Sequence, residues 1–391
     1  MAITINSTPE NYPSAHDDLY FVVTSDNTNQ NSFKYVFDIF INNTQVTRVK
    51  LYPDPSNTKG IFNAAGVVRN YIYGYFKPNA TKTAFSYTGN DIYTTYEIRF
   101  GEEYDGTTYT NLSSGSYKAF NFVNPLFRDF STSYFQPLIN TWLTGRDKNL
   151  AECGLTEKFY AGWLNTAGTT TALTLLVQKY TQSGANDGDY AQGNPVTCNT
   201  FVLFDLSPEA INTYLGYSFI TSSTYQYGVK VLYGGNGSAF MKIKVACNPR
   251  WTPITLHFLN QLGGYDSFAF RLVNRQSSQA SRKQYEQLEW QYNSGSMSRY
   301  DGYKRINGGS HAFVVDQSIS YKLTSDYISA TDYLWLKDLI ASPEVYYEKD
   351  GYYYPVNIKS TTWEEKNRIA DKMFNFELDI EFSQKVNSQY R

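Results

Sequence analysis

Cysteine is scarce in this chain, with three residues among 391. The three are Cys153, Cys198 and Cys247. They form no CxxC pair, and an odd number of cysteines cannot all be bridged within one chain, which argues against a disulfide framework. We therefore expect reduced and mostly buried thiols.

Histidine is equally scarce. The three histidines are His16, His257 and His311. They lie far apart in the sequence, and none belongs to an HxH or HExxH pattern that presents two ligands to zinc from one element. His257 lies in an apolar, strand-like run, so we expect a hydrogen-bonded structural histidine there rather than a catalytic or metal-binding one.

Long apolar runs and blocks of like charge are also missing. No stretch approaches the roughly 18 consecutive apolar residues of a membrane helix, so we expect no membrane contact. Lys plus Arg (34) almost balance Asp plus Glu (36), which disfavours nucleic-acid binding through a broad basic face. The first residues, MAITINSTPENYPSAHDD, do not read as a secretory signal, and we expect folding in a cytoplasm.

Recognisable catalytic motifs are missing as well. No Gly-x-Ser-x-Gly nucleophile elbow occurs, and the segment around Ser294 and Ser296 has the composition of a polar loop. GGNGSAF, from Gly234 to Phe240, lacks the Lys-Ser/Thr ending of a phosphate-binding loop, so a hairpin turn explains it better. The sequence predicts no catalytic residue, no cofactor and no metal ligand, and we expect the protein not to be an enzyme.

Paired carboxylates need no local motif, because a glycosidase requires only two that lie a few ångströms apart. Two polar clusters flank glycine-containing turns: Glu102, Glu103 and Asp105, and Asn186, Asp187 and Asp189. The second cluster could also hold a calcium ion through its oxygens, although its spacing does not match an EF-hand loop. Solvated surface charge is the alternative for both clusters, and we favour it.

Aromatic residues, in contrast, are abundant: 36 tyrosines and 25 phenylalanines lift the aromatic share to 17%. Such side chains suit pleated, half-buried surfaces. A length of 391 residues also exceeds what one hydrophobic core usually fills. We predict a mainly β fold (β-rich α+β) with a few short helices, as tandem β-sandwich-like domains over residues 1–125, 126–250 and 251–391.

Strands are predicted from period-two patterns and turn residues. The predicted strands are 34–41, 44–52, 93–100, 116–122, 171–181, 225–233, 239–247, 254–258, 268–274, 345–349, 352–356 and 373–383, and the last alternates between an apolar and an acidic face. Asn42-Asn43 and Asp350-Gly351 are predicted hairpin turns. Residues 183–195 are predicted as an exposed polar loop, and 277–287 as an exposed or extended segment. The segment 124–145 shows no hydrophobic period from which a helix or a strand could be assigned.

Three short helices are predicted from apolar spacing and capping residues. The first runs from Asn63 to Gly74. The second begins at Ser207, with Pro208 in its first turn, and ends at Gly216. The third begins at Ser329 and stops before Pro343.

The aromatic residues admit two interpretations. Runs such as YYEKDGYYY and the tryptophans Trp290, Trp335 and Trp363 could form a sugar-stacking platform on an adhesin. They could instead fill β cores and subunit interfaces, where large area and low entropy cost make them efficient, and we favour this second interpretation.

Five segments resemble structural tail and collar proteins of crAss-like bacteriophages that infect Bacteroides. They are FKYVFDIFIN (33–42), GIFNAAGVVRNYI (60–72), CNPRWTPITLHFLNQLGGYDSFAFRL (247–272), LTSDYISATDYLWLKDLIASPEVYYEKDGYYYPVNI (323–358) and MFNFELDIEFSQ (373–384). The resemblance leaves 130–240 poorly covered, and it carries no active-site residues.

The resemblance implies a virion component made in the host bacterial cytoplasm. It implies a subunit of a ring, collar or tail hub of a short-tailed phage, assembled around the genome-ejection conduit below the portal. The ring would have six- or twelve-fold symmetry, would contact portal, collar and tail proteins, and would touch genomic DNA only in passing. The acidic side of 373–383, with Glu377, Asp379 and Glu381, is then a hypothetical lining that repels phosphate.

Two other functions stay open. One is a glycan-binding adhesin or receptor-binding protein of a phage or bacterium, which an aromatic sugar-stacking platform would serve. The other is a carbohydrate-active enzyme on a β scaffold, which the carboxylate clusters would serve.

Overall fold

The computed structural model describes residues 3–10, 12–74, 76, 86–89, 92–123, 140–149, 151–165, 171–198, 200–246, 250–299, 309–360, 374–384 and 387–390. With 56% strand and 8% helix, the predicted mainly β fold is confirmed. The chain divides into two compact units. Unit 1 comprises Met1–Asn248, His257–Phe268 and Ala341–Pro343, and unit 2 comprises Pro249–Leu256, Ala269–Ile340 and Glu344–Arg391.

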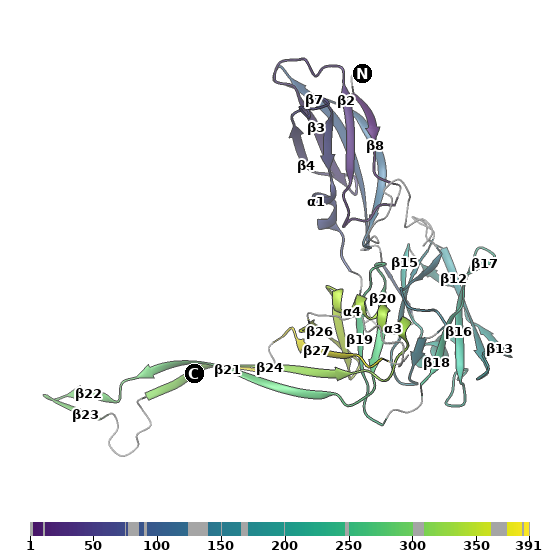
Figure 1. Ribbon diagram of the computed structural model, residues 1–391, viewed down its shortest axis with the longest axis vertical. Coiled ribbons are helices and arrows are strands. Elements are labelled where there is room, and N and C mark those ends of the chain that lie inside the picture. The colour runs from purple at the N-terminus through teal and green to yellow at the C-terminus, as the bar shows by residue number, and fades with distance from the viewer. Residues whose placement is uncertain are drawn as a thin grey trace. The chain divides into compact units, whose positions relative to one another are not determined.

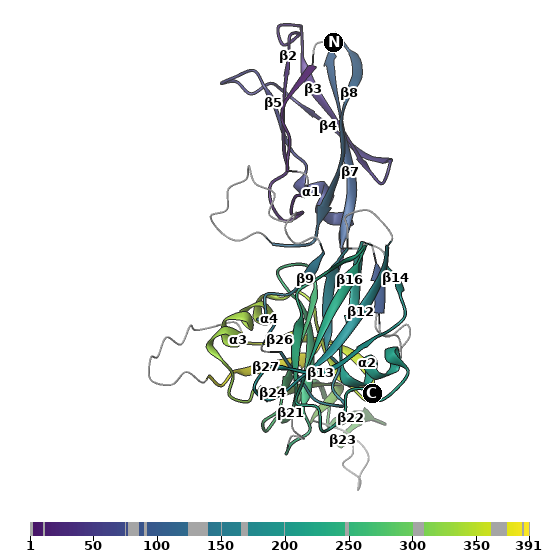
Figure 2. The ribbon, with the colours of Figure 1, turned by 90° about the vertical axis from the view of Figure 1, so that its right-hand side faces the viewer.

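The first part of unit 1 is a sandwich of two antiparallel sheets (Figure 2). One sheet has the order β1 (Ile3–Ser7), β2 (Tyr20–Ser25), β5 (Gly60–Asn63). The other has the order β4 (Thr44–Leu51), β3 (Lys34–Ile41), β7 (Tyr93–Tyr104), β8 (Thr107–Phe120). The predicted strands 34–41 and 44–52 thus pair, and Asn42 and Asn43 form the turn with φ of 47° and 66°.

The core of this sandwich comes from alternate residues of the facing strands. Tyr35, Phe37 and Ile39 of β3 are fully buried, as the period-two pattern predicts. The ring of Phe21 from the first sheet meets Phe100 from the second at 5.9 Å between centroids. Aromatic packing between the sheets therefore holds this part together.

The helix predicted from Asn63 to Gly74 is shorter than expected. It consists of α1 (Ala65–Val68) and a 3-10 turn, η1 (Arg69–Tyr71). Asn63 Oδ1 accepts hydrogen bonds from the backbone N–H of Ala65 and of Leu19, both at 3.0 Å. Asn63 thus serves both the start of the helix and a neighbouring segment.

The second part of unit 1 is also built from two sheets. The larger has the order β10 (Ala151–Cys153), β18 (Met241–Val245), β16 (Gln226–Tyr233), β12 (Thr171–Tyr180), β13 (Asn186–Gln192), with β14 (Val196–Cys198) on β12 and β17 (Asn236–Gly237) on β16. The smaller has the order β6 (Ser86–Gly89), β15 (Phe201–Asp205), β11 (Tyr160–Leu164), β9 (Thr141–Leu143). β10 and β18 run parallel, and the other described pairs here are antiparallel.

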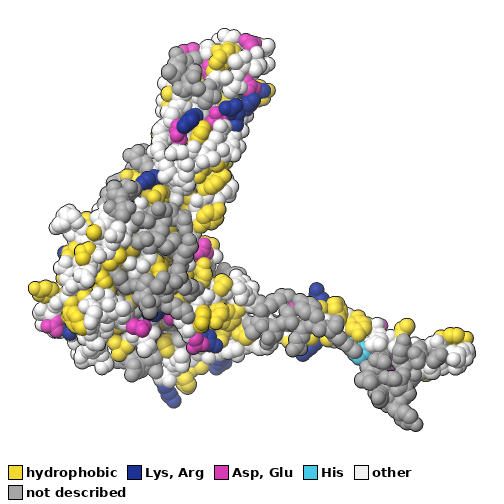
Figure 3. Space-filling model, turned by 180° about the vertical axis from the view of Figure 1, so that it is seen from behind, with side chains coloured by type: hydrophobic (Ala, Val, Ile, Leu, Met, Phe, Trp, Pro, Cys, Tyr) yellow, Lys and Arg dark blue, Asp and Glu magenta, His cyan; other side chains and the backbone are white. Residues whose placement is uncertain are grey.

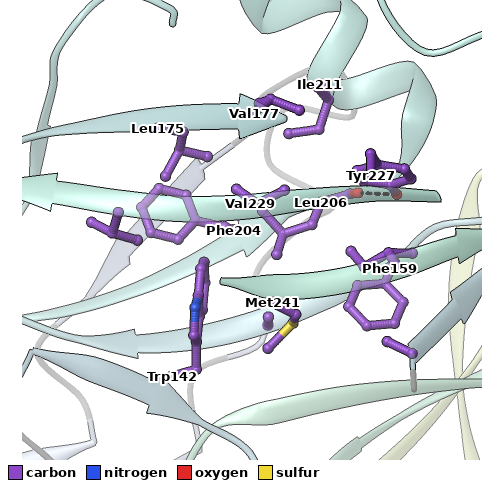
Figure 4. Packing of buried hydrophobic residues seen from close by; sticks show 14 of the residues in the cluster. Trp142, Phe159, Leu175, Val177, Phe204, Leu206, Ile211, Tyr227, Val229 and Met241 are labelled. Carbon is purple, nitrogen blue, oxygen red and sulfur yellow. Dashed lines mark hydrogen bonds between the residues drawn. The ribbon is translucent and has the colours of Figure 1, made fainter. Parts of the chain in front are cut away.

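One continuous apolar core fills the space between these sheets (Figure 4). Trp142 from the smaller sheet packs edge-on against Trp163, with 5.2 Å between ring centroids, and against Phe204. The hydroxyl of the buried Tyr227 donates a 2.7 Å hydrogen bond to the carbonyl of Leu206, which satisfies its polar end.

Helix α2 (Pro208–Leu215) confirms the predicted start and end. The Ser207 hydroxyl accepts a hydrogen bond from the backbone N–H of Ala210, and Gly216 takes the left-handed conformation with φ of 81°. The prediction of a loop over 183–195 is wrong in part, because 186–192 forms the edge strand β13. Apart from the buried Ala191, the residues of β13 are exposed, as predicted.

A further sheet, most of which belongs to unit 2, has the order β20, β19, β25, β26, β27, β24, β21, with β28 also paired to β24. The strands are β19 (Ile254–Leu259), β20 (Tyr265–Phe270), β21 (Arg275–Gln287), β24 (Gly309–Thr324), β25 (Val345–Lys349), β26 (Tyr352–Ile358), β27 (Glu377–Phe382) and β28 (Asn387–Tyr390). A hairpin of β22 (Trp290–Asn293) and β23 (Ser296–Arg299) is separate. The chain crosses from unit 2 to unit 1 within β19, after Leu256, and returns to unit 2 within β20, after Phe268.

The helices of unit 2 lie beside β26 and β27 (Figures 1 and 2). The single helix predicted from Ser329 is divided into α3 (Ala330–Trp335) and α4 (Lys337–Ala341). Ser329 caps α3 by accepting from the backbone N–H of Asp332 at 3.1 Å, as predicted. The turn at Asp350-Gly351, with φ of 53° and 72°, is also confirmed.

The predicted domain boundaries are not decided by these units. The boundary at 125/126 lies in 124–139, outside the described residues. The boundary at 250/251 lies close to the first passage between the units, at Asn248 and Pro249. Strand β6, from within the predicted first domain, pairs with β15 in the second sandwich. The division into three domains stays a prediction.

Candidate interaction surface

The most distinctive surface belongs to the long pair of strands β21 and β24 in unit 2 (Figure 1), to which β28 adds at Val314–Gln317. β21 pairs with β24 along its whole length, whereas β27 pairs with β24 only over Ser320–Thr324. We call β21, residues 309–319 of β24 and the hairpin β22–β23 the β-arm. In the β-arm, β21 is solvent-exposed at every residue except Gln287.

Polar side chains join the two strands of the β-arm. Within the β-arm, hydrogen bonds join Gln317 to Ser278 and Ser310 to Gln284, at 2.5 and 3.2 Å. At its base, they join Ser277 to Ser320 and Tyr321 to Gln276, at 2.7 and 3.0 Å. Cross-strand pairs of this kind each add a few tenths to about 1 kcal/mol to a ladder. A ribbon with little apolar packing is thereby stiffened by bonds that tolerate water.

The end of the β-arm is apolar. Ser294 and Gly295, with φ of 50° and 87°, make the tight turn of the hairpin β22–β23. Tyr292 lies directly opposite Met297, and Trp290 is two residues from Tyr292, so the three share one face. Their exposed fractions are 72%, 61% and 48%.

Leu288, at 80% exposed, precedes this hairpin. We call Leu288, Trp290, Tyr292 and Met297 the apolar tip. Hydrophobic side chains are visible along the β-arm and at its far end in Figure 3. Large exposed residues of these types, gathered in one place, mark sites of protein contact rather than ordinary surface.

Sequence reasoning found one member of the apolar tip, Trp290, and missed the others. The segment around Ser294 and Ser296, interpreted as a polar loop, is a hairpin turn between two short strands. The signal was available in QYEQLEWQYNSGSMSR, where apolar residues alternate with polar ones before a Ser-Gly turn and Met297 follows the turn.

The other two tryptophans considered for a sugar-stacking platform do not belong to the apolar tip. Trp335, in α3, is 5% exposed, so it belongs to the core of unit 2. Trp363 lies outside the described residues. The tyrosines on the two sides of Asp350 also differ in exposure: Tyr347 is buried and Tyr352 is exposed.

The first carboxylate cluster is divided between the two faces of a sheet. Glu102 and Glu103 are neighbours in β7, so their side chains point to opposite faces of the sheet. The buried Glu102 accepts hydrogen bonds from Ser25 and Asn27. Glu103 lies 2.5 Å from Lys50 Nζ, and this contact lowers the pKa of its carboxyl. Asp105 lies in the turn that follows, with φ of 49°.

The side chains of the second cluster make hydrogen bonds and an ion pair with nearby residues. The side-chain oxygens of Asn186 and Asp187 accept hydrogen bonds from the backbone N–H groups of Gly188 and Asp189, at 2.8 and 3.0 Å. Asp189 Oδ2 lies 3.1 Å from Lys179 Nζ. Within the part of the chain that the structure describes, no group of three or more His, Cys, Asp or Glu could hold a metal ion.

The histidines lie apart, as the sequence indicates. His257 is fully buried, its Nδ1 is 2.8 Å from Ser267 Oγ, and its ring stacks on Phe76. This is the hydrogen-bonded structural histidine that we predicted. His16 contacts Asn121 Oδ1 at 2.8 Å through Nε2, and His311 lies in β24.

The remaining sequence features are structural. Gly234 and Gly235, with φ of 49° and 83°, form the predicted turn after β16. Cys153 and Cys198 are buried free thiols, as expected, whereas Cys247 lies outside the described residues. None of the described helices has the length and apolar character that crossing a bilayer takes.

The proposed acidic lining is partly neutralised. β27 alternates as predicted, with Leu378 and Ile380 buried and Glu377 and Asp379 exposed. Glu377 pairs with Lys322 at 2.8 Å and Glu381 with Lys359 at 2.6 Å. The acidic side of this strand therefore carries less net negative charge than its sequence suggests.

Comparison with known proteins adds no assignment. No protein-family model matches the chain, and a search of curated proteins finds no match.

Proposed function

We propose that this chain is a structural component of a short-tailed bacteriophage, a ring, collar or tail-hub subunit that assembles around the genome-ejection conduit below the portal. The observation that carries the assembly part is the β-arm, whose exposed apolar tip suits contact with another protein. The resemblance of five segments to tail and collar proteins carries the virion part.

The rest of the described chain fits this role. Stiff β sandwiches with aromatic cores give a subunit that transmits force without deforming. Head-to-tail contacts between identical subunits close a ring when the rotation between them closes. In this proposal, the subunit acts sterically by holding the conduit and letting the genome pass.

The test is the location of the protein. Mass spectrometry of purified virions of a phage that encodes this chain should find it in proportion to the tail proteins. Negative-stain microscopy of the recombinant protein should show rings. A protein that is absent from washed virions, while the portal and capsid proteins are recovered from them, would refute the proposal.

A glycan-binding adhesin is the second candidate. The observation that favours it is that Trp290 and Tyr292 share one exposed face, because flat aromatic faces stack on sugar rings. A glycan array probed with the wild-type chain and with a Trp290→Ala, Tyr292→Ala variant separates the two functions. Binding that the variant loses would support the adhesin, and no binding to any glycan would remove it.

A further inference from the structure

The outer side of the larger sheet in the second part of unit 1 carries several lysines. In β16 and β18, residues that fill the core alternate with residues that point outward. The outward residues include Lys230 of β16 and Lys242 and Lys244 of β18. We call the outward side of the neighbouring strands β18, β16, β12 and β13 the lysine face, and Figure 2 shows three of these strands, β12, β13 and β16.

The strand register places an ammonium group and an exposed aromatic ring in one row of the lysine face. Gly228 of β16 pairs with Lys242 of β18 on one side and with Gln178 of β12 on the other. Gln178 in turn pairs with Tyr190 of β13, whose side chain is 73% exposed. A ligand that lies along this row therefore meets both groups.

Two aromatic rings position two of the lysines. Tyr180 and Phe240 pack over Gly228, where an added Cβ would lie 2.8 Å from the first ring and 3.1 Å from the second. The Nζ of Lys242 is 4.6 Å from the ring centroid of Tyr180, and the Nζ of Lys230 is 5.7 Å from that of Phe240. Such cation–π contacts orient an ammonium group without neutralising its charge.

Most carboxylates of this sheet lie on its other side. Asp187 and Asp189 of β13 are in phase with the buried Ala191, so they point away from the lysine face. Glu152 of β10 is the exception, because it pairs with Lys244. With Glu152 counted, this side of the sheet has three positive charges and one negative charge. No charged residue occurs in the loops that follow β12, β13 and β16, which are 181–185, 193–195 and 234–240.

The side chains of the lysine face suit single-stranded nucleic acid. Lysines neutralise phosphates, exposed rings stack on bases, and amides form hydrogen bonds with base edges. The amides here belong to Gln178, Gln192 and Gln226, which also point outward. A neutral glycan would supply no charge opposite to the lysines. A duplex keeps its bases stacked inside, so it would offer no free base to Tyr190.

We propose that the lysine face binds single-stranded nucleic acid, with Lys230, Lys242 and Lys244 on phosphates and Tyr190 on a base. At about 4.8 Å between strands, the four strands span about 15 Å, which accommodates a few nucleotides. The balanced charge of the whole chain does not oppose this binding, because folding gathers the three lysines on one side of a sheet. Such binding is a further activity, and it does not depend on the proposed function.

The experiment measures the fluorescence anisotropy of a labelled oligothymidylate of about 20 nucleotides as the full chain is added, at several salt concentrations. The wild type should bind, and log K should fall by about 0.7 per unit of log salt for each phosphate contacted. Lys242→Gln, Lys244→Gln should weaken binding at low salt at least about tenfold and reduce this slope by about 1.4. Glutamine keeps part of the apolar stem over Tyr180, and an unaltered circular dichroism spectrum will show that the variant folds.

Two further tests separate this site from charge in general. Arg282→Gln, Lys283→Gln removes two exposed positive charges from the β-arm and should bind as the wild type does. Tyr190→Ala should weaken binding at least about fivefold, because a base loses its stacking partner. Tyr190→Phe keeps the ring and should bind as the wild type does.

Four results would overturn this assignment. The first two are a wild type that does not bind the oligonucleotide at low salt, and equal weakening by the two double variants. The third is unchanged binding by Tyr190→Ala, because the contact would then depend on charge alone. The fourth is tighter binding of duplex DNA of the same length. None of these results bears on the proposed function, which is tested by whether virions contain the protein.

Discussion

The ammonium nitrogen of Lys158 lies 3.3 Å from the carboxylate Oδ2 of Asp205, a residue that is 2% exposed. Asp205 also accepts a 3.0 Å hydrogen bond from the backbone N–H of Ser207, at the start of α2. Burial raises the pKa of Asp205, and the attraction of Lys158 opposes that rise. Burial lowers the pKa of Lys158, but Asp205 and Glu209 outweigh it, and the net shift is upward.

Lys158→Met should destabilise the fold by about 3 kcal/mol at pH 7, because removing one partner leaves the buried charge of Asp205 uncompensated. The pKa of Asp205 should rise further in the variant. Protonation then removes the unpaired charge, so the loss of stability relative to the wild type should shrink as the pH falls through that pKa. Urea unfolding between pH 4 and pH 8 measures it.

The matched control is Lys179→Met, which removes the partner of the exposed Asp189. That variant should lose less than about 1 kcal/mol, with little dependence on pH. Equal losses of stability for the two variants, or a loss for Lys158→Met that does not change with pH, would show that Lys158 does not compensate the buried charge of Asp205.

Gly263→Ala should be far more damaging than Gly184→Ala, although both glycines have a φ near 80°. A Cβ at Gly263 would lie 2.0 Å from the backbone oxygen of Asn121, whereas a Cβ at Gly184 would meet nothing within 4 Å. We expect about 1 kcal/mol for Gly184→Ala from the left-handed backbone, and about 3 kcal/mol or more for Gly263→Ala. Thermal and urea unfolding of the two variants, compared with the wild type, test this difference.

Local rules explain which parts of this fold the sequence predicted. The turns at Asn42-Asn43 and Asp350-Gly351 depend on residues that tolerate positive φ, and the caps at Ser207 and Gly216 depend on single side chains. Each rule involves a few consecutive residues. The structure confirms each of them.

These local rules could not predict contacts between segments that lie far apart in the sequence. The pairing of β6 with β15 joins segments more than 100 residues apart, and no local pattern announces it. Glu102 and Glu103 look like a pair in the sequence, but their strand separates them to opposite faces. The exposure of Tyr292 depends on where the hairpin lies rather than on its own sequence, so the apolar tip became visible only in the structure.

Cys198 should be inert toward thiol reagents in the folded protein. Burial raises its pKa to about 12, so almost no thiolate is present at pH 8, and the thiolate is the reactive form. Cys153 is also buried and should react slowly. Maleimide labelling at pH 8, with and without urea, followed by peptide mass spectrometry, measures both. Labelling of Cys198 as fast in buffer as in urea would contradict its burial.

The backbone of the β-arm should exchange hydrogen rapidly in the monomer. Ladder bonds open most easily where few apolar side chains cover them, and β21 is exposed along nearly its whole length. In dilute protein, peptides within 276–287 should exchange at least about 100-fold faster than those of β7, whose Tyr96, Ile98 and Phe100 are buried. Hydrogen-exchange mass spectrometry resolves both segments in one experiment.

Measuring hydrogen exchange at several protein concentrations shows whether a second molecule covers the β-arm. Docking of the β-arm on a second copy would slow its exchange as concentration rises, and exchange in β7 would stay constant. Slow exchange of 276–287 at every concentration would instead mean that the β-arm packs against its own chain. Since the polar ladder between Ser277 and Ser320 is present in either case, a difference with concentration can come only from cover supplied by another molecule.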